Sequence, residues 1–272
     1  MGAINLGPFA LPLVPLLLIA AALAASAVAR RSGRRRRIEA EAPLLRILLA
    51  GLVAARIAFV AAYFDEYRGA PWSMIDIRDG GFSLGAGILA GLALAAWYGW
   101  RQSALRAPLL HSLATGAAIW TIGTTALAGL GNDPPGLPPL ELARLDGSPL
   151  QLSALAGKPV VLNLWATWCP PCRREMPVLR DAQDRHPDVT FVFVNQGEAA
   201  ATIRSYLDAE RLALKHVLLD PASRLGAHLG SHSFPTTLFF DASGKLVERR
   251  VGEVSAATLT RALEPLRADS RR

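Results

Sequence analysis

Two cysteines, Cys169 and Cys172, are the only ones in the chain, and two prolines separate them with the spacing of a redox pair. The pair follows an apolar run, residues 159–165, that is typical of a buried strand, and it precedes a segment with helical periodicity. We therefore expect the first thiol at a helix N-terminus, where free N–H groups and the helix dipole stabilise a thiolate. The second thiol, one turn later, is placed to close an internal disulfide and release a bound partner.

Two other interpretations of the pair are a zinc site and a structural disulfide. Zinc needs four ligands and no second cysteine pair exists, although His228 and His232 could complete a Cys₂His₂ set. A purely structural disulfide across so short a loop would constrain the unfolded chain only weakly. Redox chemistry is the favoured interpretation, and we expect neither a metal nor another cofactor.

The N-terminal half, residues 1–131, is dominated by apolar runs long enough to cross a bilayer. Four candidate transmembrane helices lie in this half. They cover residues 9–29, 43–64, 82–100 and 108–130. The first run lacks a basic segment before it and a small-residue cleavage site after it, so we interpret it as a retained helix.

The net charge of +7 is concentrated beside these spans. Six arginines fall within residues 30–37, and Arg101 and Arg106 mark the loop between the third and fourth runs. By the positive-inside rule both loops are cytoplasmic, so both termini face outward. From residue 137 onward the chain has 17 basic and 15 acidic side chains, and no nucleic-acid partner is expected.

This topology predicts a multi-pass protein of a bacterial inner membrane with its cysteine pair in the periplasm, where disulfides persist. The predicted spans contain no cysteine, so electrons must come from a separate membrane thiol donor. Arg46 can snorkel to the cytoplasmic interface. Arg56 lies deeper in its span, where a functional role and an ion pair with an acidic loop residue are both open.

Around these residues the N-terminal half resembles a shortened prolipoprotein diacylglyceryl transferase, through residues 55–60 (ARIAFV) and 80–87 (GGFSLGAG). The family's active-site histidine falls on Gly85, and its Gly-Arg-Ile-Gly-Asn signature falls on residues 120–124, which lack the arginine and the asparagine. The resemblance implies a shared membrane architecture and contact with membrane lipid, but not acyl-glyceryl transfer. Close helix packing explains the glycines equally well.

A Pro/Gly-rich linker, residues 132–139, separates this half from a domain covering 140–272. Strands and helices alternate in the domain, which predicts a mixed sheet covered on both faces. The expected strands are 140–145, 149–152, 159–165, 189–195, 215–219, 236–240 and 245–251, and the expected helices are 170–186, 198–211, 221–229 and 255–267.

This domain closely resembles the thioredoxin fold of the TlpA-like group. An extra helix and strand between Asn195 and Pro235 match that group's central αβ insertion, and Pro177 matches the proline that kinks its first long helix. The resemblance implies a cis bond at Pro235, which shapes the groove where a substrate chain docks beside the cysteines. We expect Trp168, Pro170 and Phe234 to contact that substrate.

A glutamate three residues after the second cysteine is a further mark of the TlpA-like group, and Glu175 matches it. The resemblance implies that this carboxylate takes the proton of Cys172. A solvated first-turn glutamate, favoured by the helix dipole, is the structural alternative. Thioredoxin's buried aspartate is replaced here by Asn163.

The expected function is a membrane-anchored protein thiol:disulfide oxidoreductase that reduces disulfides of exported proteins through Cys169 and Cys172. An oxidase or isomerase of the same fold, and a lipid-binding or scaffold membrane protein with an accessory thioredoxin domain, are the alternatives. A peroxidase is disfavoured because Ala166 stands where a threonine would be needed. A lipid transferase is disfavoured by the missing signature residues.

Overall fold

The structure is a computed structural model that describes residues 3–6, 9–130, 136–231 and 233–269. The chain divides into two compact units. Among the described residues, the helical unit contains residues 3–4, 11–75 and 80–130, and the α/β unit contains residues 136–231 and 233–269 together with the short segments 5–6, 9–10 and 76–79. Residues 132–135 of the predicted linker and His232 of the alternative zinc set lie outside the described residues.

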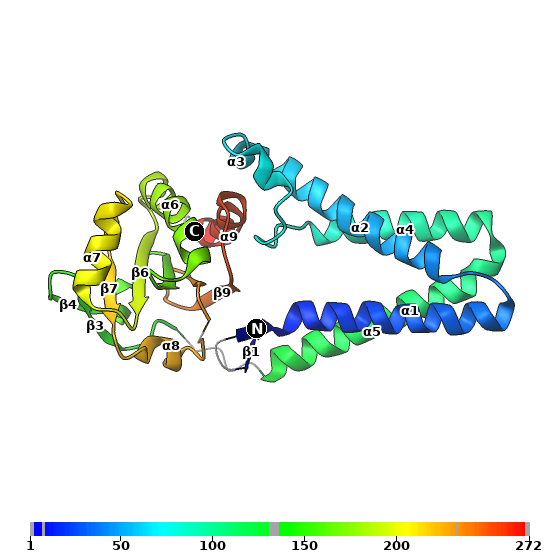
Figure 1. Cartoon of the computed structure of the whole chain (residues 1–272), viewed down its shortest axis with the longest axis horizontal. Helices are drawn as coiled ribbons and strands as arrows, with labels where there is room; N and C mark the ends of the chain where they lie inside the picture. Colours follow the sequence, from blue (N-terminus) through cyan, green and yellow to red (C-terminus); the bar gives the residue numbers. More distant parts are fainter. Residues whose placement is uncertain (1–2, 7–8, 131–135, 232, 270–272) are drawn as a thin grey trace. The chain divides into compact units, whose positions relative to one another are not determined.

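Long helices make up the helical unit, with α1 packed along α5 and α2 packed along α4 (Figure 1). The long helices are α1 (Leu13–Arg36), α2 (Glu41–Ala62), α4 (Leu84–Arg101) and α5 (Arg106–Leu130). The short elements are β1 (Ala3–Leu6), β2 (Phe9–Pro12), α3 (Phe64–Tyr67), η1 (Pro71–Met74) and η2 (Ser103–Leu105). Ala25 and Ala29 of α1 form a buried cluster with larger apolar residues, which are Leu44, Ile47, Leu105 and Leu109.

The first predicted span was wrong at both ends, because residues 9–12 form β2 and the helix runs from Leu13 to Arg36, so most of the arginines expected in the following loop lie in its last turns. The residue before a proline is disfavoured in the helical region, which suits the extended conformation of Leu11 before Pro12. Among the described helices, α1 from Pro15 and α2 are long and apolar enough to cross a membrane. The other two spans stay a prediction.

Close backbone approach joins α2 to α4. A Cβ atom added at Gly87 would lie 2.9 Å from the Gly51 carbonyl oxygen, and one at Gly51 would lie 3.0 Å from the Gly87 carbonyl oxygen. Gly87 therefore serves helix packing, as small residues do between membrane helices. Gly85, by contrast, has open space where its Cβ would be.

The α/β unit contains a seven-stranded sheet in the order β4-β3-β7-β6-β5-β8-β9. The strands are β3 (Glu141–Arg144), β4 (Pro149–Gln151), β5 (Val160–Trp165), β6 (Thr190–Gln196), β7 (Val217–Asp220), β8 (Thr236–Phe240) and β9 (Leu246–Val251). The central strands β5, β6 and β7 are parallel, whereas β8 and β9 continue the sheet antiparallel beside β5. Every residue of β5 is buried, as expected for a strand covered on both faces.

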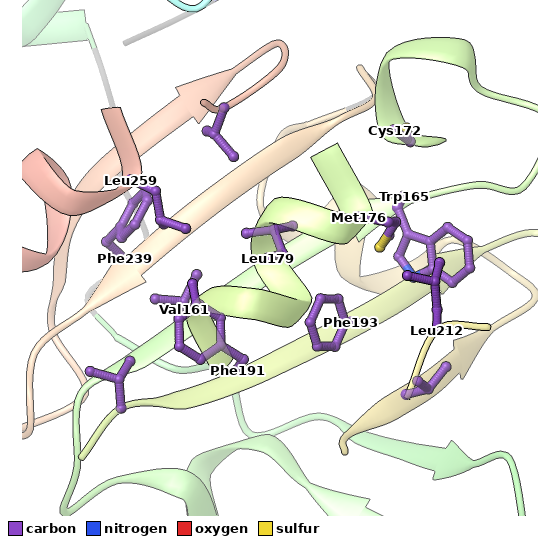
Figure 2. Close-up of a cluster of buried hydrophobic side chains, with 14 of the residues drawn as sticks. Val161, Trp165, Cys172, Met176, Leu179, Phe191, Phe193, Leu212, Phe239 and Leu259 are labelled. Atoms are coloured by element: carbon purple, nitrogen blue, oxygen red, sulfur yellow. The ribbon is translucent and has the colours of Figure 1, made fainter. Parts of the chain in front are cut away.

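Helices cover the two faces of this sheet. They are η3 (Leu152–Leu155), α6 (Pro170–Arg185), α7 (Ala200–Ala209), α8 (Arg224–His228) and α9 (Ala256–Asp269). Side chains alternate along β5, so Val161 and Trp165 join one core with Met176 of α6 and Leu259 of α9 (Figure 2). Val160, Leu162 and Leu164 join the second core on the opposite face. The expected thioredoxin-like α/β arrangement is present, and α7, β7 and α8 occupy the predicted insertion.

Candidate functional site

Cys169 and Cys172 lie where β5 leads into α6, and they are joined by a disulfide with a Cα–Cα distance of 5.3 Å. Cys169 is the N-cap of α6, and its Sγ accepts a hydrogen bond of 3.4 Å from the backbone N–H of Cys172. Pro170 begins the helix, a position that proline tolerates because the first N–H groups have no partner within the helix. The predicted helix N-terminus is confirmed, and it favours a thiolate at Cys169.

Glu175 is fully buried one turn after Cys172, so the solvated alternative was wrong. Its Oε1 accepts a 2.7 Å hydrogen bond from Asn163 Nδ2, and its Oε2 accepts a 2.9 Å bond from the backbone N–H of Val254. Burial raises the pKa of Glu175 to about 8, although these two hydrogen bonds oppose the rise. A carboxyl with such a pKa can exchange a proton with a thiol near neutral pH.

Asn163 contacts the Glu175 carboxyl without adding a second acidic group to the site. Its Nδ2 donates both to Glu175 and, at 3.0 Å, to Thr237 Oγ1 on the neighbouring strand β8. A second carboxylate at this position would face Glu175 with like charge, which the two groups could relieve only by sharing a proton. The amide instead donates to the carboxylate and adds no charge.

Pro235 follows a cis peptide bond with Phe234, which confirms the expected cis proline. The Pro235 carbonyl accepts a 2.9 Å hydrogen bond from the N–H of Gly252, so this loop is tied to the turn after β9. Phe234 is half-buried and packs against the core that contains both cysteines. The proline itself is buried.

Trp168 stands at the rim of the site with 66% of its surface exposed. Its ring meets that of Phe234 edge-on, with 6.1 Å between the centroids, and Pro170 beside it is exposed. The three residues expected to contact substrate thus share one rim around the buried cysteine pair. Their role in binding stays a prediction.

Glu198 was missed by the reasoning from sequence. Its Oε2 accepts 2.7 Å hydrogen bonds from the backbone N–H of Thr167 and from Asn195 Nδ2, so it holds the segment immediately before Trp168. A positive φ of 80° at Gly197 turns the chain after β6 and brings Glu198 to this segment. A lone glutamate after a buried strand and a glycine was the only local signal.

Arg56 is buried in the helical unit, in contact with the loop that follows α2. It donates to the carbonyl oxygens of Ser73, Met74 and Gly81 at 3.0, 3.0 and 2.8 Å. Its guanidinium also lies 5.5 Å from the centre of the Tyr67 ring. Arg56 therefore has a structural role, because it donates hydrogen bonds to backbone carbonyls that are costly to leave unpaired.

Comparison with known proteins finds one family for each half. The family model of prolipoprotein diacylglyceryl transferase matches residues 1–132, and that of Redoxin matches residues 131–263. Thioredoxin-like protein YneN of Bacillus subtilis is 30% identical over 131 residues, which are 47% of this chain and 76% of that protein.

Thiol-disulfide oxidoreductase ResA of Bacillus thuringiensis is 30% identical over 111 residues, or 40% of this chain, and the chain spans only 64% of that relative's length. A solved structure of MTB dsbF in mixed oxidised and reduced forms is 30% identical, with a TM-score of 0.46, covering 50% of this chain and 99% of its own. Each half of the chain therefore matches a family that its motifs resemble.

Proposed function

This chain belongs to the ResA/TlpA-like family of thioredoxin-like thiol-disulfide oxidoreductases, and from that premise we propose that it reduces disulfides of exported proteins while anchored in a membrane. The observation that carries the proposal is the disulfide at the N-terminus of α6 with a buried carboxyl one turn away. The apolar helices α1 and α2 support the anchoring. A bacterial inner membrane, with the α/β unit in the periplasm, is the proposed location.

The first step is attack by the Cys169 thiolate on a disulfide sulfur of the client protein. A mixed disulfide forms, the client's own S–S bond breaks, and one client sulfur leaves as a thiolate that takes a proton. The helix N-terminus favours Cys169 as the attacking group. Trp168, Pro170 and Phe234 contact the client chain in this step, with Pro235 shaping the loop.

The second step uses Cys172. Glu175 takes the proton of the Cys172 thiol, and the resulting thiolate attacks Cys169 Sγ. The Cys169–Cys172 disulfide forms, the mixed disulfide breaks, and the second client cysteine leaves and is protonated. The client has gained two electrons and the pair has lost two, so a separate membrane thiol donor must restore the dithiol.

The direction of electron flow is tested by trapping the cysteines with acid in growing cells, alkylating the free thiols and reading the gel shift. A pair that is mainly reduced in an oxidising compartment supports the proposal, because only a dedicated donor could hold it so. A mainly oxidised pair would contradict it and favour the oxidase alternative. The Cys172→Ser variant marks the band position of a single reduced thiol and should retain clients as mixed disulfides.

A further inference from the structure

Helix α6 and the loop between β9 and α9 are joined by two adjacent contacts. Inside, the backbone N–H of Val254 donates to Glu175 Oε2 at 2.9 Å. One residue earlier on both segments, Arg174 donates from Nε and Nη2 to Glu253 Oε2 at 2.9 and 2.7 Å. A partly exposed ion pair thus lies directly beside the buried hydrogen bond that Glu175 accepts.

The loop that carries Glu253 is held from its other side as well. Gly252 has a φ of 100°, a conformation that turns the chain sharply as β9 ends. The N–H of Gly252 donates to the Pro235 carbonyl. The orientation of the Val254 N–H is therefore set by this anchor on one side and by the Arg174–Glu253 pair on the other.

The charge of Glu253 also acts on Glu175. Glu175 faces the neutral Asn163 on β5 and the loop of Glu253, and the ion pair beside it joins Glu253 of that loop to Arg174 of α6. Burial is the larger cause of the raised pKa of Glu175, and the negative charge of Glu253 raises it further.

We propose that Glu253, held by Arg174, is a positioning residue that keeps the Val254 amide on Glu175 and sets the charge facing it. The negative charge of Glu253 makes Glu175 a stronger base for Cys172, whereas the Val254 amide that it holds in place acts in the opposite direction and limits the rise in the pKa of Glu175. The inference rests on the proposed role of Glu175 in the redox cycle.

The charge is tested with Glu253→Gln in the full chain in detergent micelles. The variant removes the negative charge and keeps an oxygen to accept from Arg174. The carboxyl ¹³C NMR signal of Glu175, assigned by its loss in Glu175→Gln, should titrate with a midpoint at lower pH than in the wild type. An unchanged midpoint would overturn the proposal.

Glu210→Gln is the matched control, because Glu210 pairs with Arg173, the neighbour of Arg174 on α6. It should leave the Glu175 midpoint where it is, and an equal shift in this control would also overturn the proposal.

Whether the Arg174–Glu253 pair holds the Val254 amide in place is tested by measuring hydrogen exchange of that amide in Arg174→Met and Arg174→Lys. Loss of a partly exposed ion pair should speed the exchange roughly two- to fivefold in the Met variant, and Lys should restore part of the protection. No change in the Met variant would overturn the positioning. Both measurements are made without a client, so a chain that shows these effects but fails to exchange disulfides would refute the proposed function alone.

Discussion

Replacing Glu175 by Gln should stabilise the α/β unit, and by an amount that depends on pH. Burial raises the pKa of this carboxyl from 4.5 to about 8. Between those values the folded state binds more protons than the unfolded state, so the carboxyl makes the fold less stable as pH rises from about 4.5 to about 8. Glutamine carries no such penalty and still offers an oxygen to the Val254 N–H.

The size of the effect follows from the same two values. The buried charge lowers the free energy of unfolding by roughly 1 kcal/mol at pH 5 and by roughly 4 kcal/mol at pH 8. The difference in unfolding free energy between Glu175→Gln and wild type should therefore be larger at pH 8 by roughly 3 kcal/mol. For a unit of this size that corresponds to a melting-temperature gap wider by about 10 °C. The change with pH is the informative quantity, because packing differences between the two side chains affect both pH values alike.

The measurement is urea unfolding of the full chain in detergent at pH 5 and pH 8, followed by pulsed hydrogen exchange and mass spectrometry of the β5 peptides. These peptides report on the α/β unit separately from the helical unit. Glu210→Gln, which removes a half-exposed carboxyl, should show no comparable widening. If the difference in unfolding free energy between Glu175→Gln and wild type is the same at both pH values, burial does not raise the pKa of Glu175.

The same variant should be a poor catalyst despite its stability. Without a base for Cys172, the mixed disulfide should resolve roughly 100-fold more slowly at neutral pH, within the usual range for loss of a general base. Stopped-flow mixing with a disulfide peptide, with acid quenching of the mixed disulfide, measures this step. Resolution at the wild-type rate would remove Glu175 from the proposed mechanism.

Two further substitutions test the rim and the helical unit. Trp168→Ala should raise KM for a disulfide peptide roughly five- to tenfold with little change in kcat, since the exposed ring contacts substrate but not the reacting sulfurs; an effect confined to kcat would contradict this. Arg56→Met should destabilise the helical unit by about 3 kcal/mol, because the carbonyls of Ser73, Met74 and Gly81 lose their donor. Thermal unfolding measures this loss of stability, and Arg56→Lys, which keeps one donor group, should recover part of it. An unchanged melting temperature in Arg56→Met would refute the structural role of Arg56.

What could be read from the sequence was local. A cysteine pair three residues apart at the start of a helix shares one turn whatever surrounds it, so its redox chemistry followed from spacing alone. Short apolar runs rich in β-branched residues, such as residues 160–165, are typical of buried strands, and the sheet was predicted from them. The family motifs added Glu175 and the cis bond at Pro235, because both lie at fixed distances from other recognisable residues.

Contacts between distant segments were decided by the tertiary structure. A glutamate in the first turn of a helix has the same local pattern whether it is solvated or buried, and Glu175 is buried because β5 and the loop of Val254, 79 residues away, close over it. Glu198 reaches Thr167 across 31 residues for the same reason. The sequence by itself determined the reacting atoms and the strands that carry them, whereas only the packing of the folded chain decided which groups surround those atoms, and hence the proton affinity on which the chemistry depends.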